Sequence, residues 1–240
     1  MSIRNKIALI TGAGGGIGRA IAENLAKEGV NLVLFGGNNV ENLSKTEEIV
    51  LSYGAKCLTI SGNLTDKAFL IDGVKRVVDT FGGIDILINN AGKGVNYAFE
   101  DTTEELFDEI MTINVKVPFL LTKECLPYLK NSDYATIVNI ASVTAHYGYE
   151  NQSAYSASKH ALLGMTKALA REVYKQNIRV HAVSPGGVYT DMVKITRPDL
   201  TPDGMIMPSD VADIVNFLIT HRTNAVVDEI ELHRANKQPF

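Results

Sequence analysis

Short runs of apolar residues alternate along the whole chain with longer segments in which apolar side chains recur at helical spacing. The apolar runs are the predicted strands, and they cover Ile7–Ile10, Asn31–Phe35, Lys56–Ser61, Ile84–Asn89, Ala135–Ile140, Arg179–Ser184 and Val226–Leu232. The predicted helices between them cover residues 17–28, 40–53, 65–81, 102–130, 153–177 and 209–221. Continuous Val, Ile and Leu runs are typical of strands that are covered on both faces, as in a parallel sheet.

This alternation predicts the fold class. Strands and helices that follow one another with short connections imply right-handed crossovers and an α/β fold, a single-domain doubly wound parallel β-sheet (Rossmann-like) with helices on both faces. No composition break, linker or repeat divides residues 1–240. The least regular segment is 187–208, with Pro198, Pro202 and Gly204, and it is expected to be a mobile loop over a substrate site.

Composition narrows the function classes. Of the 240 residues, 45% are hydrophobic and 21% are charged, which is ordinary for a soluble globular protein. The net charge of −4 argues against a nucleic-acid or anionic-membrane surface. Cys57 and Cys125 have no metal-ligand spacing around them and are expected to be reduced thiols, with no metal site. Ile7–Ile10 is too short for a signal peptide, and no run approaches the ~20 apolar residues of a membrane span. A cytoplasmic protein is expected.

A glycine cluster follows the first predicted strand, between Thr11 and Gly18. Glycines at a strand-to-helix turn let the backbone approach a pyrophosphate, whose charge the helix N-terminus favours. The spacing is G-x3-G-x-G, with Gly12, Gly16 and Gly18, because Ile17 stands where the usual G-x-G-x-x-G pattern needs its third glycine. No G-x4-G-K-[ST] occurs, which disfavours a nucleoside-triphosphate P-loop. The alternative is a tight turn without a ligand.

The end of the second predicted strand bears on the choice of dinucleotide. An NAD site normally shows an acid there and an NADP site an arginine nearby. This chain has Gly36, Gly37, Asn38 and Asn39, with neither charge. The missing carboxylate removes repulsion against a 2′-phosphate, and the next helix can offer backbone N–H groups to it. This slightly favours NADP over NAD as the cofactor, and the choice stays open.

A possible proton donor lies in the fifth predicted helix. Tyr155 and Lys159 are four residues apart and therefore share one helix face. A tyrosine alone has a pKa of about 10, and a neighbouring ammonium is expected to lower that pKa towards neutrality. The hydroxyl of Ser142, thirteen residues before Tyr155, is able to hydrogen-bond a carbonyl or alcohol oxygen. The trio predicts carbonyl–alcohol chemistry.

Together these motifs resemble the short-chain dehydrogenase/reductase family over nearly the whole chain. Thr11–Gly18 is similar to its cofactor loop, Asn89–Gly92 to the segment after its fourth strand, and 185–190 to the stretch that contacts the nicotinamide. The resemblance implies a catalytic tetrad of Asn114, Ser142, Tyr155 and Lys159. It also implies a set of cofactor-binding residues: Gly12, Gly16, Ile17, Gly18, Gly36, Gly37, Asn38, Asn63, Leu64, Asn90, Ala91, Gly92, Tyr155, Lys159, Pro185, Gly186, Val188 and Thr190.

The resemblance implies a role for each member of the tetrad. Tyr155 exchanges the substrate proton, and Ser142 positions the substrate oxygen. Lys159 lowers the tyrosine pKa and holds the nicotinamide ribose. Asn114 bends its helix locally and supports a water in the proton relay. Between Ser142 and Tyr155, a short aromatic group is expected either to line the substrate pocket or to pack the loop: His146, Tyr147 and Tyr149.

Within the family, much of the chain resembles bacterial 3-oxoacyl-(acyl-carrier-protein) reductases, for instance residues 167–172. Two features depart from that pattern. The last strand runs into the polar segment Glu229–Arg234 where a glycine pair is usual, and residues 128–133 offer one lysine and one aspartate where an acidic carrier needs a basic surface. The alternatives are a broad-specificity ketone, alcohol or sugar dehydrogenase and, on the same fold, a non-catalytic dinucleotide sensor.

Apolar residues on more than one face of the two longest predicted helices, 102–130 and 153–177, indicate an oligomer. A helix that lies on a sheet needs one apolar stripe, so further apolar surface implies another partner. The family resemblance points to the same helices. A homo-oligomer, a tetramer, is expected, and its other partner is a small-molecule carbonyl or alcohol substrate.

Overall fold

A parallel sheet of seven strands forms the centre of the protein in the computed structural model, which describes residues 2–196 and 199–237. The strands are β1 (Ile7–Thr11), β2 (Asn31–Gly36), β3 (Cys57–Ser61), β4 (Ile86–Asn89), β5 (Thr136–Ile140), β6 (Arg179–Pro185) and β7 (Glu229–Leu232). Their order is β3-β2-β1-β4-β5-β6-β7, and every neighbouring pair is parallel. The predicted doubly wound sheet is confirmed.

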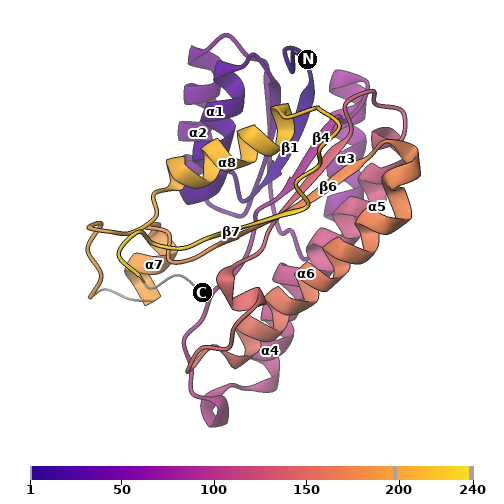
Figure 1. Ribbon diagram of the computed structural model, residues 1–240. Helices are drawn as coiled ribbons and strands as arrows, with labels where there is room; N and C mark the ends of the chain where they lie inside the picture. The colour runs from indigo at the N-terminus through magenta and orange to yellow at the C-terminus, as the bar shows by residue number, and fades with distance from the viewer. Residues whose placement is uncertain (1, 197–198, 238–240) are drawn as a thin grey trace.

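Helices cover both faces of the sheet (Figure 1). They are α1 (Gly16–Lys27), α2 (Val40–Ser52), α3 (Lys67–Phe81), α4 (Glu104–Met111), α5 (Val117–Leu129), α6 (Ser153–Val173), α7 (Asp191–Thr196) and α8 (Pro208–Thr220). One apolar layer joins α1, α2 and α8 to the sheet, and the other joins α3, α5 and α6 to it. None of the helices in the described part of the chain is long and apolar enough to cross a membrane.

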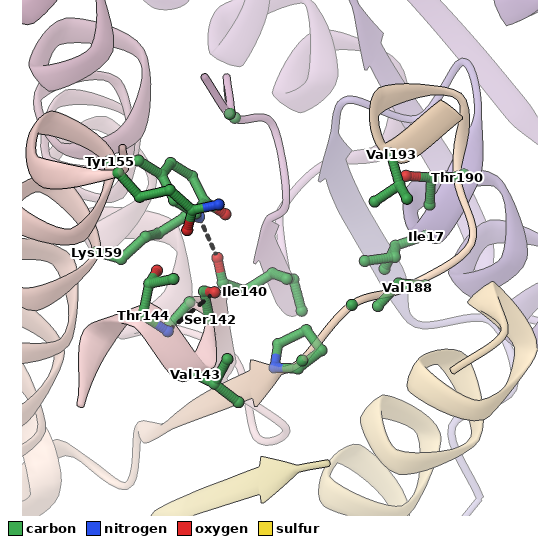
Figure 2. Close-up of a pocket in the computed structure, with 18 of the residues that line it drawn as sticks. Ile17, Ile140, Ser142, Val143, Thr144, Tyr155, Lys159, Val188, Thr190 and Val193 are labelled. Atoms are coloured by element: carbon green, nitrogen blue, oxygen red, sulfur yellow. Dashed lines mark hydrogen bonds between the residues drawn. The ribbon is translucent and has the colours of Figure 1, made fainter. Parts of the chain in front are cut away.

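The order in which the chain adds strands to the sheet reverses between β1 and β4. After β3 at one edge it returns to the other side of β1, so the connections that follow β1 and β4 diverge at the carboxyl ends of the strands. Open α/β sheets bind ligands at such a point. A pocket of about 830 Å³ lies there, between the end of β1 and the start of α6 (Figure 2).

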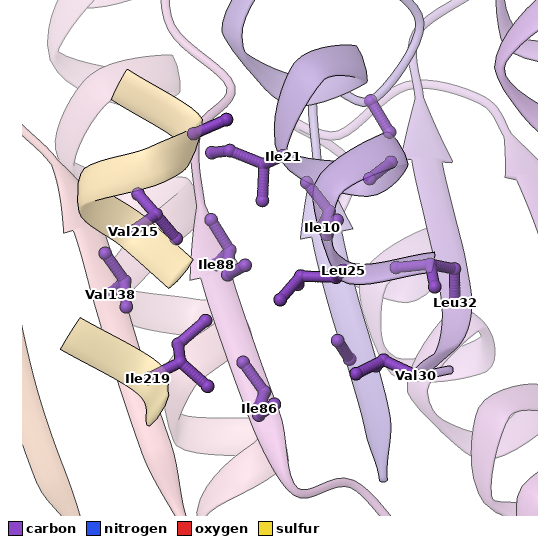
Figure 3. Close-up of a cluster of buried hydrophobic side chains, with 14 of the residues drawn as sticks. Ile10, Ile21, Leu25, Val30, Leu32, Ile86, Ile88, Val138, Val215 and Ile219 are labelled. Carbon is purple, nitrogen blue, oxygen red and sulfur yellow. The ribbon is translucent and has the colours of Figure 1, made fainter. Parts of the chain in front are cut away.

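The layer on the α1 and α8 side consists of buried apolar side chains (Figure 3). Ile21 and Leu25 of α1 meet Val215 and Ile219 of α8 above β1 and β4, and all four side chains are fully or almost fully buried. Burial of such a side chain stabilises a fold by roughly 1.5–3 kcal/mol. This packing fixes the position of α1, and therefore of its N-terminus, relative to the end of β1.

The predicted helix 102–130 is the main departure from the expected elements. The chain forms a short 3₁₀ helix at Phe99–Asp101, then α4, a single π turn at Thr112–Lys116, and α5. Pro118 explains the break, because it lacks the N–H that an α-helix would direct to the carbonyl of Asn114. The structure thus has a π turn around Asn114, where the resemblance implies a local bend, and Pro118 is a cause of that turn that the sequence shows.

Three smaller differences concern the C-terminal half. The helix predicted at 153–177 ends as α6 at Val173 and continues as a 3₁₀ turn at Tyr174–Gln176. Segment 187–208 contains the unpredicted helix α7, and Val188 pairs with Ile206 as an isolated bridge, so the segment folds back on itself. Residues 197 and 198 of that segment lie outside the described residues. β7 begins three residues later than predicted.

Candidate active site

The glycine spacing is explained by contacts between β1, α1 and the segment after β4. Gly12 has a φ of 66°, and a Cβ atom there would lie 2.9 Å from Nδ2 of Asn90 and 3.0 Å from Cα of Ala91. A Cβ atom on Gly18 would lie 2.3 Å from the carbonyl oxygen of Gly12. Gly12 thus satisfies a left-handed turn and a close approach to the β4 segment, and Gly18 lets α1 pack on the loop. Neither position tolerates a side chain.

Hydrogen bonds fasten the same two loops together. Thr11 Oγ1 accepts from the backbone N–H groups of Asn90 and Ala91, both at 3.0 Å. Nδ2 of Asn90 donates to the carbonyl oxygens of Thr11 at 2.9 Å and Gly12 at 3.2 Å. These hydrogen bonds join the end of β1 to the segment after β4, and the two together form the floor of the pocket.

The N-terminus of α1 points towards this floor and suits a phosphate group. Its N-cap is Gly15, which makes no side-chain capping hydrogen bond, so the first N–H groups of the helix are not satisfied by a cap. Gly16 has a φ of 50°, and a Cβ atom there would meet Cγ2 of Thr190 at 3.0 Å. A narrow cradle between α1 and residues 188–190 results, with Ile17, Val188 and Thr190 around it in Figure 2. This cradle fits a pyrophosphate.

Arg19, which was not singled out from the sequence, supports the glycine loop from behind. Its Nη2 donates to the carbonyl oxygens of Gly14 and, at 2.9 Å, Asn42, and its Nε donates to Thr46 Oγ1 at 3.0 Å. Thr46 Oγ1 in turn donates to the carbonyl of Ala13 at 2.9 Å. The guanidinium therefore ties the glycine loop to α2. A cation in the first turn of a helix opposes the helix dipole, and that unfavourable placement is a signal for a specific contact.

The end of β2 shows why Gly36 and Gly37 differ. Gly36 is buried, and a Cβ atom there would lie 2.8 Å from Cδ1 of Leu43, whereas Gly37 is exposed with nothing within 4 Å. Asn39 accepts the N–H of Asn42 at 3.0 Å and caps α2. Substitutions that would read a ribose therefore fit at position 37 and not at position 36.

Ser142 and Tyr155 meet at the opposite wall of the pocket. Ser142 follows β5 and accepts the N–H of Thr144 at 3.2 Å, which starts a 3₁₀ turn at Val143–Ala145. Tyr155, in the first turn of α6, lies close enough to Ser142 for that hydroxyl to act on the pKa of the phenol. Figure 2 shows both side chains turned into the same space, across the pocket from Thr190. The two hydroxyls can act together on one substrate oxygen.

Lys159 lies one turn along α6 and is 4% exposed. Its Nζ donates to the carbonyl oxygen of Ile140 at 2.9 Å and stands 5.7 Å from the centre of the Tyr155 ring. Burial lowers the pKa of Lys159 to about 8. Burial also raises the pKa of Tyr155, and the neighbouring hydroxyl of Ser142 opposes that rise.

The raised pKa of Tyr155 is opposite to the direction predicted from the Tyr155–Lys159 spacing. Helical spacing brings the two side chains together, but the ammonium is directed to the Ile140 carbonyl, and removal from water dominates the phenol. A phenol with a raised pKa is protonated at neutral pH. It therefore holds a proton that a carbonyl oxygen could accept, although the raised pKa makes it a weaker acid than a free tyrosine.

Asn114 lies behind this wall and outside the pocket lining. It is fully buried, its Oδ1 accepts the N–H of Lys93 at 2.8 Å, and its Nδ2 donates to Lys93 O at 3.0 Å and Ser158 Oγ at 2.9 Å. Ser158 Oγ donates to the carbonyl of Tyr155 at 2.7 Å. A Cβ atom on Gly92 would lie 3.1 Å from Asn114 Oδ1. The side chain of Asn114 thus positions α6 against the β4 segment.

Most predicted site residues line the pocket. They are Gly12, Gly16, Ile17, Asn90, Ala91, Gly92, Ser142, Tyr155, Lys159, Pro185, Gly186, Val188 and Thr190. Those outside its described lining, besides Asn114, are Gly18, Gly36, Gly37, Asn38, Asn63 and Leu64. Asn63 accepts from Thr65 in a turn before α3, and Leu64 is buried. Of the aromatic group, Tyr147 and Tyr149 line the pocket. His146 is not part of the described lining, and its Nε2 lies 2.9 Å from Oε1 of Glu229.

Comparison with known proteins identifies the family. The model of the short chain dehydrogenase family matches residues 6–201, which include the glycine loop, the tetrad and the segment after β6. The chain belongs to the short-chain dehydrogenase family. It is 34% identical over 238 residues to the 3-oxoacyl-[acyl-carrier-protein] reductase of Thermotoga maritima, covering 96% of each chain.

Solved structures of short-chain dehydrogenases have the same fold. The 3-ketoacyl-(acyl-carrier-protein) reductase of Brucella melitensis, complexed with NADH, has a TM-score of 0.86 and 29% identity over 96% of this chain and 97% of that one. An alcohol dehydrogenase of Thermococcus sibiricus, complexed with 5-hydroxy-NADP, has a TM-score of 0.89 and 25% identity over 99% and 100%. The protein is therefore an oxidoreductase of the short-chain dehydrogenase family, and a nicotinamide dinucleotide is its cofactor.

Proposed function

We propose that this oxidoreductase interconverts a ketone and a secondary alcohol, with Tyr155 as the proton donor in reduction. The observation that carries the proposal is that Ser142 and Tyr155 line the same pocket as the uncapped N-terminus of α1. When bound, the nicotinamide supplies or accepts the hydride. Ser142 holds the substrate oxygen, and Tyr155 gives that oxygen its proton. Lys159, buried beside the ring, would hold the nicotinamide ribose.

The binding mode of the dinucleotide follows from the same geometry. The pyrophosphate would lie on the N-terminus of α1 between Gly12, Gly16 and Thr190, and residues 185–188 would face the nicotinamide. At the ribose end, Gly37 and Asn38 are exposed and uncharged, so we propose a modest preference between NADP and NAD, in favour of NADP.

For the substrate class, we propose a 3-oxoacyl compound of the kind that the Thermotoga maritima relative reduces. A broad-specificity ketone, alcohol or sugar dehydrogenase is the second candidate, and the open, tyrosine-lined end of the pocket favours it. All four tetrad residues are present, which disfavours a non-catalytic sensor. A cytoplasmic location remains a prediction.

Tyr155→Phe tests the proposal, because it keeps the ring and removes the proton. Oxidation of NADH and NADPH would be followed with ketones, acetoacetyl thioesters and sugars. Turnover should fall by at least the ~10²–10⁴-fold typical of general acid–base groups, while dinucleotide binding, measured by calorimetry, stays unchanged. Tyr174→Phe is the matched control, since Tyr174 is 64% exposed in the 3₁₀ turn that follows α6 and lies outside the pocket lining. Near-normal turnover of Tyr155→Phe would reject the mechanism.

A further inference from the structure

The C-terminal tail, residues 233–237, enters the pocket beside the segment that faces the nicotinamide. The N–H of Gly186 donates to the carbonyl of Leu232, the last residue of β7, at 2.7 Å. A Cβ atom on Gly186 would lie 3.8 Å from Cα of His233. The tail therefore leaves the sheet next to residues 185–187, and His233, Arg234 and Lys237 are part of the pocket lining.

Arg234 is the most firmly placed of the three. It is half-buried, its Nη1 lies 3.1 Å from Sδ of Met205, and its Nε would be 3.8 Å from a Cβ atom on Gly187. Asn236 of the tail packs on the 187–208 segment, since a Cβ atom on Gly204 would lie 2.1 Å from its Nδ2. Figure 1 shows this yellow tail beside α7. The guanidinium is thus held between the nicotinamide-facing turn and the expected substrate loop.

The charged side chains of the described residues at this end of the pocket leave an excess of one cation. None of the salt bridges between described side chains involves Arg234 or Lys237. Two acids share the lining, Glu231 and Asp191, and the second binds Lys194 Nζ at 3.0 Å. Glu231 therefore opposes the two cations of the tail, and the balance suits a ligand with one negative charge.

We propose that the substrate is an oxo acid or hydroxy acid whose free carboxylate is bound by Arg234. The inference rests on the proposed ketone–alcohol chemistry, and it replaces the 3-oxoacyl thioester suggested by the relative with a free acid as the substrate. The planar guanidinium matches a carboxylate with two parallel hydrogen bonds, and a half-buried site strengthens them. A doubly charged phosphate is less suited, because Glu231 cancels part of the positive charge. Residues 128–133, the basic surface sought for an acidic carrier, hold Lys130 and an Asp133 already paired with Lys6.

Matched pairs of a free acid and its neutral methyl ester test this assignment. The wild type would be assayed with 3-oxobutanoate, 4-oxopentanoate and 5-oxohexanoate, each beside its ester, since chain length sets the span from the ketone to Arg234. For the acid of best length, Arg234→Met should lower kcat/KM about 10–100-fold, the range expected for loss of a charged hydrogen bond. For its ester the change should stay within about threefold, and dinucleotide affinity should be unchanged.

Two further variants separate a local contact from a general charge effect. Glu231→Gln removes the opposing carboxylate, so it should raise kcat/KM for the acid several-fold and leave the ester unaffected. Arg171→Met removes the same charge as Arg234→Met from an exposed position of α6 outside the pocket lining. It should leave kcat/KM unchanged for both the acid and the ester.

The outcomes distinguish this inference from the proposed function. Reduction of the esters with no preference for any acid, an equal loss on acid and ester in Arg234→Met, or weakened dinucleotide binding in that variant would overturn the carboxylate site alone. A loss confined to acetoacetyl-coenzyme A relative to the neutral acetoacetyl-N-acetylcysteamine thioester would assign Arg234 to a phosphate instead. No turnover of either member of any pair would overturn the proposed function together with the inference.

Discussion

Replacing Lys159 by methionine is expected to change how the stability of the protein depends on pH. The lysine is 4% exposed, and burial lowers its pKa from 10.5 to about 8. Each pKa unit is worth 1.36 kcal/mol, so keeping the ammonium buried at pH 7 costs the folded state about 3 kcal/mol. Methionine has a similar length and no charge to desolvate.

The net effect of Lys159→Met on the unfolding free energy at pH 7 is small, because the loss of a hydrogen bond opposes the gain from removing the buried charge. Without the ammonium, the carbonyl of Ile140 loses the donor that now lies at 2.9 Å, at a cost of about 1–3 kcal/mol. The variant should therefore equal the wild type at pH 7 or exceed it by up to about 2 kcal/mol, although its turnover and dinucleotide affinity fall.

The pH dependence separates the two terms. Because the pKa of Lys159 is about 8 in the folded state and near 10.5 in the unfolded chain, the unfolded chain binds more protons between these values. Wild-type stability should therefore rise with pH in that window, and the variant should lack this rise. Between pH 7 and pH 10 the difference in unfolding free energy should shift by roughly 2–3 kcal/mol in favour of the wild type.

Urea unfolding at fixed protein concentration between pH 7 and pH 10 measures this difference. Lys123→Met is the control, since that side chain is exposed on α5 and both states leave its ammonium in water. Parallel pH curves for the wild type and Lys159→Met would refute the reasoning and show that Lys159 is hydrated in the folded protein.

Two other predictions concern the dinucleotide and the assembly. The wild-type preference between NADH and NADPH, measured by steady-state kinetics, should stay below roughly a thousandfold, about 4 kcal/mol. Gly37→Arg should shift this preference towards NADPH by pairing with the 2′-phosphate, and Gly37→Asp should shift it towards NADH by charge repulsion. Gly36→Asp should instead destabilise the fold through Leu43, visible as a lower Tm. A homotetramer joined through helices 102–130 and 153–177 should lose mass in light scattering on Phe119→Glu, since Phe119 is 52% exposed; a fully active wild-type monomer would contradict this assembly.

Several features of the site could be predicted because they depend on neighbours in the chain. Apolar runs such as Ile7–Ile10 predict buried parallel strands wherever they pack. Gly12 and Gly18 follow the first strand at a spacing that the local turn requires, and the structure shows the contacts that exclude side chains there. Tyr155 and Lys159 share a helix face by spacing alone. The break at Pro118 was also visible, but helical periodicity on both sides of it concealed the π turn.

The remaining features depend on residues that the fold brings together from distant positions. Gly36 and Gly37 are adjacent glycines that the sequence does not distinguish. Only the packing of α2 places Leu43 against Gly36 and leaves Gly37 open. The guanidinium of Arg19 finds its partners on α2, and Arg234 reaches the pocket because β7 pairs beside β6. The pKa values of Tyr155 and Lys159 follow the same rule, since burial is set by every element around a side chain. The sequence by itself therefore determined which chemical groups this short-chain dehydrogenase carries and on which elements, and the tertiary structure alone decided their charge states and neighbours, because solvation and long-range contacts exist only after the chain has packed.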